Sequence, residues 1–498
     1  MELENRTSYR NIVKGTAIFG GTQVFNILIN VIRGKLVAMI LGPAGMGVTA
    51  IFSSAISPIQ QFSTFGLPYS AVQGISSEND EERKRNIVRS FRIIMRIAAC
   101  IGSIITIMLS PLLSELSFGN KDYTWSFVFL SLAVFFFALN QGCNTVLQGY
   151  RRLKSLALCS IVGSIAGLVV CIPLFYFYGV EGVIPSMILL ALISYLVSYY
   201  GVRKIKLKTA FLSWKCVWDD CKNMVALGLT MMIAVVLGNL YVFSLNSFIR
   251  FFGSLADVGL FQAANTIINQ YMGMVFAAMA TDYYPHLSSI IKDRNKTIEL
   301  VKEQGEITLF VVAPIAVLII ITAPLIIEIL LTHDFISVLS IIKYMGLGAI
   351  AKAAVFPLGY LSVAHGDKAY YFMMEGVFAN VKGFVVFAGF YYLWGFEGLG
   401  VAALFNSCVD IIIAVLMNKW RYNITYDIKF MIVMLCLFLV ASICLLCSFI
   451  SNVIVSYVTM ILIGSLLSLY CFKELDKRID IRNIIVTRIP KRKLNENS

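Results

Sequence analysis

Apolar runs of roughly membrane-spanning length dominate this chain, and short polar segments separate them. A helix needs roughly 20 mostly apolar residues to cross the hydrocarbon core of a bilayer. The pattern therefore predicts about fourteen transmembrane helices. The predicted spans cover residues 12–41, 45–75, 87–112, 124–149, 155–178, 181–202, 224–252, 257–290, 299–330, 336–363, 370–393, 398–419, 430–450 and 452–472.

Composition supports this interpretation. Of the 498 residues, 58% are hydrophobic and 14% are charged. Soluble globular chains carry about 25% charged residues, so this chain cannot cover a water-facing surface. The expected fold class is an all-α polytopic membrane protein.

The positive charges predict the orientation of the chain. Most of the 41 lysines and arginines fall in every second loop and in the last segment, from Lys473 to Lys493. This is the pattern of cytoplasmic loops, and it predicts that both termini lie in the cytoplasm. The net charge of +13 is then a consequence of topology. No basic stretch is interleaved with stacking aromatics, so a nucleic-acid partner is not expected.

A short turn sequence occurs twice. Gly179-Val180-Glu181-Gly182 and Gly395-Phe396-Glu397-Gly398 lie 216 residues apart. Glycine permits the tight backbone reversal that joins two helices, so the expected role of both turns is structural. Lys154 and Lys368, each after a predicted span, lie 214 residues apart, and Gly47 and Gly259 lie 212 apart.

These offsets predict an internal repeat of six spans. An even number of spans puts both copies in the same orientation, related by an axis along the membrane normal. The expected architecture is two pseudo-symmetric six-helix bundles plus a C-terminal helix pair. The predicted parts are an N-terminal bundle at 1–202, a cytoplasmic linker at 203–223, a C-terminal bundle at 224–420, and an extra helix pair with a basic cytoplasmic tail at 421–498.

Charges that topology does not explain identify the candidate binding site. A cation at the bilayer centre costs at least about 2.5–3.5 kcal/mol, so it is expected to face water, a partner or a ligand. We predict that these cations line a substrate-binding cavity: Arg33, Lys35, Arg96, Arg250, Lys343, Lys352 and Lys382. Lys35 and Arg250 lie near span ends, where they are also long enough to reach the outer surface.

Fewer acidic residues lie inside the spans. Glu375 and Lys382 are seven residues apart, so one helix face can carry both as an ion pair. Asp410 and Glu375 are the candidates for coupling to protons. Acids are too few to neutralise the cations, and a net positive interior predicts an anionic passenger such as a phosphate or pyrophosphate rather than a cationic drug.

Amides and prolines add two expectations. Asparagines and glutamines are frequent inside the spans, and most of them fall in spans one, two, seven and eight: Gln23, Asn26, Asn30, Gln60, Gln61, Asn140, Gln141, Asn239, Asn246, Asn265, Asn269 and Gln270. Helix-to-helix hydrogen bonds or a wet cleft between the halves would account for them. Proline kinks a helix, and the predicted gating hinges are Pro58, Pro68 and Pro285, with static kinks as the alternative.

No cofactor or metal site is expected. The eleven cysteines are scattered mostly through the spans, where cysteine serves as a small apolar filler. The three histidines share no site, and neither a phosphate-cradling glycine loop nor a nucleophile motif occurs.

The chain resembles a known family of exporters. The features are Leu41-Gly-Pro-Ala-Gly-Met-Gly-Val48 after span one, Gln148-Gly-Tyr-Arg-Arg152 after span four, the two G-x-E-G turns and the added helix pair. Together they resemble the polysaccharide-transport branch of the multidrug/oligosaccharidyl-lipid/polysaccharide exporter superfamily, in particular O-antigen flippases of the Wzx type. The resemblance implies two bundles around a cationic cavity, without fixing a substrate-binding residue.

The resemblance also implies a function. The expected activity is flipping of an undecaprenyl-pyrophosphate-linked oligosaccharide, an O-antigen or similar surface polysaccharide unit, between leaflets of the bacterial inner membrane by alternating access. Its expected partners are this lipid-linked glycan, membrane lipids and glycan polymerase machinery. The alternatives are a lipid II flippase, a multidrug antiporter of the same superfamily, and a membrane glycan polymerase or ligase. Span one carries no acid of the kind that such antiporters use, and no outer loop is large enough for a catalytic site, so a transporter is favoured over an enzyme.

Overall fold

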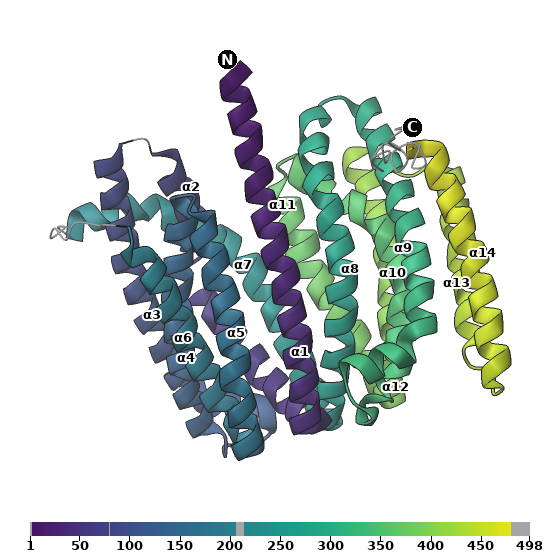
Figure 1. Ribbon diagram of the computed structural model, residues 1–498, viewed down its shortest axis with the longest axis horizontal. Helices are drawn as coiled ribbons and strands as arrows, with labels where there is room; N and C mark the ends of the chain where they lie inside the picture. The colour runs from purple at the N-terminus through teal and green to yellow at the C-terminus, as the bar shows by residue number, and fades with distance from the viewer. Residues whose placement is uncertain (1, 79, 206–213, 480–498) are drawn as a thin grey trace, which may run out of the picture. The chain divides into compact units, whose positions relative to one another are not determined.

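The computed structural model describes residues 2–78, 80–205 and 214–479 (Figure 1). Over these residues the chain is helical, and no strand occurs among them. The helices are α1 Glu2–Phe62, α2 Leu67–Ser77, α3 Glu81–Phe118, α4 Thr124–Gly149, α5 Leu153–Tyr178, η1 Gly179–Gly182, α6 Val183–Arg203, α7 Trp214–Phe252, α8 Leu255–Ile290, α9 Arg294–Leu330, η2 His333–Phe335, α10 Val338–Ala364, α11 Lys368–Tyr371, η3 Phe372–Phe378, α12 Ala379–Tyr422, α13 Ile428–Cys447 and α14 Val453–Ile479.

The prediction of an all-α membrane protein is confirmed. Ten helical segments within the described ranges are long and apolar enough to cross a membrane. The predicted number of fourteen is not confirmed, because some of these segments are very long; one runs from Leu153 to Arg203. The predicted domain boundaries stay a prediction. Parts of the predicted linker (206–213) and tail (480–498) lie outside the described residues, and α7 begins at Trp214, inside the predicted linker.

The chain forms two compact units. Unit 1 comprises Met1–Ala263, Ile327–Ile336 and Phe372–Tyr392, and unit 2 comprises Ala264–Ile326, Ser337–Tyr371 and Leu393–Ser498. Within unit 1, α3 packs on α4, α4 on α6, α6 on α5, and α5 on α1, as neighbouring ribbons in Figure 1. Helices α2, α3 and α4 enclose an apolar core that includes Leu67, Phe91 and Val146.

Three glycines produce sharp reversals in long helical stretches. Gly42, Gly179 and Gly395 all have φ near +60°, at 64°, 55° and 60°. This left-handed region carries little penalty for glycine alone. The first glycines of the two G-x-E-G sequences therefore adopt the same left-handed backbone conformation at equivalent turns. Glu181 and Glu397, two residues after them, are exposed.

The two copies of the predicted repeat touch at equivalent glycines. A Cβ atom on Gly47 would collide with the carbonyl oxygen of Leu255, and one on Gly259 would collide with the carbonyl oxygen of Pro43. Both pairs of equivalent residues, 43 with 255 and 47 with 259, differ by 212 positions. The contact is thus self-complementary, as a two-fold relation between the copies requires.

A turn separates α1 from α2 inside the second predicted span. Phe65 and Gly66 have φ values of 48° and 63°, and Pro68 is the second residue of α2. A Cβ on Gly66 would collide with the backbone of Gly228 in α7, so this turn packs directly on that helix. Ser70 Oγ then donates a hydrogen bond of 2.8 Å to the carbonyl of Met224.

Unit 2 has a continuous apolar core. Helices α9, α10, α13 and α14 supply most of its members, including Phe310, Ile350, Leu358 and Leu445. Two buried tyrosines at this core donate hydrogen bonds to carbonyl oxygens of α10. Tyr426 bonds the carbonyl of Ala354 at 2.8 Å, and Tyr283 bonds that of Pro357 at 3.0 Å.

Candidate functional site

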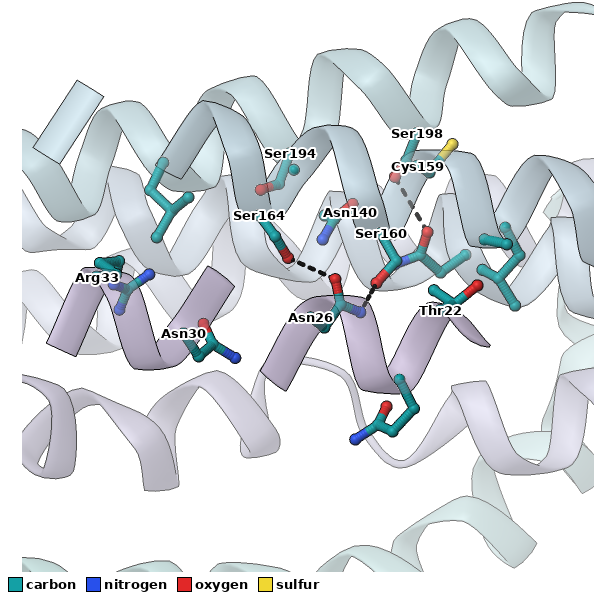
Figure 2. Close-up of a pocket in the computed structure, with 16 residues that line it drawn as sticks. Thr22, Asn26, Asn30, Arg33, Asn140, Cys159, Ser160, Ser164, Ser194 and Ser198 are labelled. Carbon is teal, nitrogen blue, oxygen red and sulfur yellow. Dashed lines mark hydrogen bonds between the residues drawn. The ribbon is translucent and has the colours of Figure 1, made fainter. Parts of the chain in front are cut away.

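A polar pocket lies within unit 1, between helices α1, α4, α5 and α6 (Figure 2). Its volume is about 460 Å³. Pockets of about 300–1,000 Å³ are typical of small-molecule sites. Amides and hydroxyls form most of its lining, and none of the described residues that line it is a carboxylate.

Helix α1 supplies one wall of the pocket. Thr22, Asn26, Asn30 and Arg33 lie along it at intervals of four, four and three residues. This spacing puts them on one face of the helix. Figure 2 shows Asn26, Asn30 and Arg33 following one another along the pocket side of α1.

Helix α5 holds the side chain of Asn26 at both ends. Asn26 Nδ2 donates to Ser160 Oγ at 2.7 Å, and Ser164 Oγ donates to Asn26 Oδ1 at 2.8 Å (Figure 2). Gly163, on the same helix, also lines the pocket without filling it. The result is a fixed amide beside open space.

Helices α4 and α6 supply the opposite wall. Ser198 Oγ donates to Asn144 Oδ1 at 3.0 Å. Asn140 Oδ1 is buried and accepts no hydrogen bond from any described residue. A buried polar atom without a partner costs about 1–3 kcal/mol, so a bound ligand or water that donates to Asn140 would remove that cost.

Arg33 is the one charged group among the described lining residues. Its Nη1 atom lies 3.6 Å from the position that a Cβ on Gly167 would occupy, so the guanidinium lies against this part of α5. The side chain is half-buried, and no ion pair joins it to a carboxylate in the described parts of the chain. The pocket therefore has a net positive charge.

Lys35, two residues further on, has a different environment. Its Nζ donates to the carbonyl oxygens of Glu328 and Ile329 at 3.3 and 2.7 Å. These carbonyls end helix α9, where the helix dipole attracts a cation. Lys35 is thus occupied as a helix cap rather than lining the pocket.

Lys343 is a second helix cap. It is only 7% exposed. Its Nζ lies 3.5 Å from the carbonyl oxygen of Ser448, just after α13, and 5.3 Å from the ring centre of Phe449. This placement favours a structural role for Lys343 in unit 2.

The other predicted cavity cations are not among the residues that line the pocket. Arg96 on α3 is exposed, and Arg250 on α7 is half-buried, with its Nε buried and without a described hydrogen-bond partner. Lys352 on α10 is exposed and Lys382 on α12 is half-buried. Their role in binding substrate stays a prediction.

The two predicted coupling acids lie in different surroundings. Glu375 belongs to η3, a π-helical turn, and it is exposed. Short π-helical turns within α-helices are frequent at functional sites. Asp410 is half-buried on α12 and accepts a hydrogen bond of 3.0 Å from Asn406 Nδ2.

The predicted hinges also differ from one another. Pro58 lies inside α1 and Pro285 inside α8, and both helices continue through them. Pro68 instead begins a new helix after the turn at Phe65 and Gly66, so the second predicted span is divided in two. A gating role for all three stays a prediction.

Charged residues at helix ends of unit 2 are paired, in contrast to Arg33. Arg421 Nη2 lies 2.7 Å from Asp367 Oδ2, and Lys302 Nζ lies 2.6 Å from Asp427 Oδ2. The Arg421 guanidinium holds the pKa of Asp367 below its usual range by hydrogen bonding to it. The ammonium of Lys302 lowers the pKa of Asp427 in the same way.

Sequence reasoning found part of this pocket and assigned it differently. Gln23, Asn26 and Asn30 of the first predicted span were expected to form helix-to-helix hydrogen bonds or to line a cleft between the halves, and they line the pocket inside unit 1 together with Asn140 of the fourth predicted span. The residues it missed are Thr22, Asn144, Ser160, Ser164, Ser194 and Ser198. A usable signal was the spacing of small residues in α5, where Ser160, Gly163, Ser164 and Gly167 recur on one helical face.

Comparison with known proteins gives the family. A family model described as "Polysaccharide biosynthesis protein" matches residues 36–340, more than half of the chain. The chain belongs to this family.

Relatives of this polysaccharide biosynthesis protein are flippases and transporters. The lipid III flippase of Escherichia coli is 22% identical over 370 residues, which cover 73% of this chain and 88% of the relative. The fold is similar to the lipid II flippase MurJ in an inward closed conformation, with a TM-score of 0.69, 16% identity, and coverage of 93% and 99% of the two chains. It is also similar to an inward-facing MATE multidrug transporter, with a TM-score of 0.62, 17% identity, and coverage of 80% and 94%.

These findings define the class of this family member. The family is that of polysaccharide biosynthesis proteins, and the fold is shared with a lipid II flippase and a MATE transporter. The described part of the chain contains ten helical segments that are long and apolar enough to cross a membrane, and its fold is that of flippases and transporters. The resemblance found from its short sequence motifs is confirmed.

Proposed function

We propose that this protein flips an oligosaccharide linked to undecaprenyl pyrophosphate, the unit of an O-antigen or similar surface polysaccharide, across the bacterial inner membrane. Transport proceeds by alternating access from the inner to the outer leaflet, with both termini in the cytoplasm. Membership in a polysaccharide biosynthesis family and similarity to a lipid III flippase support a lipid-linked glycan as the cargo.

One observation carries the proposal: among the residues that the structure describes, the Arg33 guanidinium has no carboxylate partner, and no carboxylate lines its pocket. Arg33 supplies a positive charge, and the amides and hydroxyls around it supply hydrogen bonds for a glycan. Arginine binds phosphate and carboxylate groups through two parallel N–H donors. A cationic drug would meet repulsion at this site.

A lipid II flippase is the second candidate, because the fold is similar to MurJ over nearly the whole chain. The proposal includes proton coupling through Asp410 or Glu375 and a partnership with glycan polymerase machinery.

The test is complementation in two bacterial strains. One strain lacks its O-antigen flippase, and the other depends on a repressible lipid II flippase. We expect this protein to restore surface glycan in the first strain and to leave the second strain unable to grow under repression. Growth of the second strain without glycan export in the first would favour a lipid II flippase over a flippase of surface glycan. Failure to complement either strain would refute the proposal.

A further inference from the structure

We propose that the pocket between α1, α4, α5 and α6 is a subsite for one sugar of the glycan, and that this sugar carries a single carboxylate, as a uronic acid does. The inference rests on the proposed function and specifies the chemistry of its cargo. It separates recognition of the sugar from recognition of the diphosphate.

The charge of the pocket supports a monoanion. Arg33 is the one cation among its described lining residues, and none of them is an acid. One guanidinium matches one carboxylate in a bidentate pair. A diphosphate carries at least two negative charges, so one charge would stay uncompensated in this half-enclosed site, which is unfavourable.

The hydrogen-bonding groups fit a sugar ring. A sugar hydroxyl both donates and accepts, and the pocket offers both kinds of group. Asn140 Oδ1 is a buried acceptor without a described partner, and the Arg33 guanidinium offers donors. A carboxamide likewise has both functions, so Asn30 and Asn144 can serve either.

The pocket is also held in shape before any ligand binds. Asn26 is fixed at both ends by Ser160 and Ser164, and Asn144 is held by Ser198. Side chains that are already ordered lose little conformational entropy on binding. The volume of about 460 Å³ suits a single ring with its substituents rather than a whole oligosaccharide.

The experiment compares two lipids in proteoliposomes that contain the full-length protein. Both are undecaprenyl-diphosphate-linked disaccharides, one ending in glucuronic acid and the other in glucose. A fluorescent label on the sugar and an impermeant quencher report the flipping rate. We expect the wild-type protein to flip the acidic lipid about tenfold to hundredfold faster than the neutral one, the range for hydrogen bonds to a charged group.

Variants then locate the source of this preference. We expect Arg33→Gln to bring the ratio of the two rates close to one. Asn140→Leu removes an acceptor for hydroxyls that both sugars share, so it should slow both lipids and keep the ratio. Lys35→Gln is the matched control, because this cation lies two residues away and bonds the end of α9, so the ratio should not change.

The possible outcomes distinguish failure of the proposed sugar subsite from failure of the proposed flippase function. Equal rates for both lipids in the wild-type protein would overturn the sugar subsite while leaving the flippase function intact. An equal slowing of both lipids by Arg33→Gln would assign Arg33 to the diphosphate and also overturn it. Flipping of neither lipid would overturn the proposed function as well. Thermal unfolding of each variant in detergent checks that the protein is folded.

Discussion

The two copies of the repeat fill their interiors in opposite ways. In the first copy, Asn140 and Asn144 of α4 line a polar pocket. The residues 214 positions later on α10 are Ala354 and Leu358, which are 0% and 1% exposed and belong to the apolar core of unit 2. At these positions the first copy therefore has a polar pocket, whereas the second copy has a packed apolar core.

The same contrast holds along the first helix of each copy. Asn30 and Arg33 face the pocket, whereas the residues 212 positions later are apolar: Leu245 is buried, and Val242 is 38% exposed. At these equivalent positions the two predicted copies therefore differ in polarity: the first lines a polar pocket, and the second is apolar.

The largest expected effect comes from making the second copy resemble the first. Leu358→Asn would remove buried apolar volume and place an amide without partners in the core. We expect a loss of about 4 kcal/mol or more in the free energy of unfolding, measured by chemical or thermal denaturation in detergent.

The matched control is Asn144→Leu, the reverse change at the equivalent position. It forfeits one hydrogen bond with Ser198, so its cost should stay below about 1.5 kcal/mol. Equal destabilisation by the two changes would mean that the two interiors do not differ as described.

The second largest effect is on the rate of flipping, and it is expected for Arg33 but not for Lys343. Arg33→Gln should lower the rate of glycan flipping about tenfold to hundredfold with little change in thermal stability, because Arg33 has no carboxylate partner in the described chain. Lys343→Met should leave flipping unchanged, since Lys343 is buried against α13. Apolar replacement of a buried charge is often neutral or stabilising. Loss of flipping in Lys343→Met would instead support the prediction that Lys343 binds the substrate.

The third effect concerns the helix cap within unit 1. Lys35→Met removes the ammonium from the carbonyls of Glu328 and Ile329. We expect a loss of about 0.5–2 kcal/mol of stability, seen as a lower thermal midpoint, and partial rescue by Lys35→Arg. A variant with unchanged stability but slower flipping would assign Lys35 to the substrate instead.

The smallest effect is a pH dependence at a helix end of unit 2. Hydrogen bonding from Arg421 lowers the pKa of Asp367 in the folded protein. A carboxylate with a lowered pKa stabilises the fold above its unfolded pKa of about 3.9, and this stabilisation is lost as the pH falls through the folded value.

The thermal midpoint of Asp367→Asn should therefore lie slightly below that of the wild-type protein from pH 8 to pH 5. The difference should shrink below about pH 4. A constant difference down to pH 3 would show that the charge of Asp367 does not contribute.

Sequence by itself determined the class of fold and predicted the repeat. Long apolar runs predict membrane helices whatever their packing, because a backbone in lipid must satisfy its own hydrogen bonds. The repeated glycines at 179 and 395, and at 47 and 259, could be found in the sequence because glycine is favoured at a left-handed turn and is required at a direct backbone contact.

Tertiary structure alone decided what each intramembrane cation does. Arg33 and Lys35 are two residues apart and look alike in the sequence, yet one lines a pocket and the other ends a helix from a distant part of the chain. The cost of placing a charge in a membrane is the same for both, so the sequence predicts that each needs a partner. Which partner it meets depends on the helices packed against it, and those come together only in the folded protein.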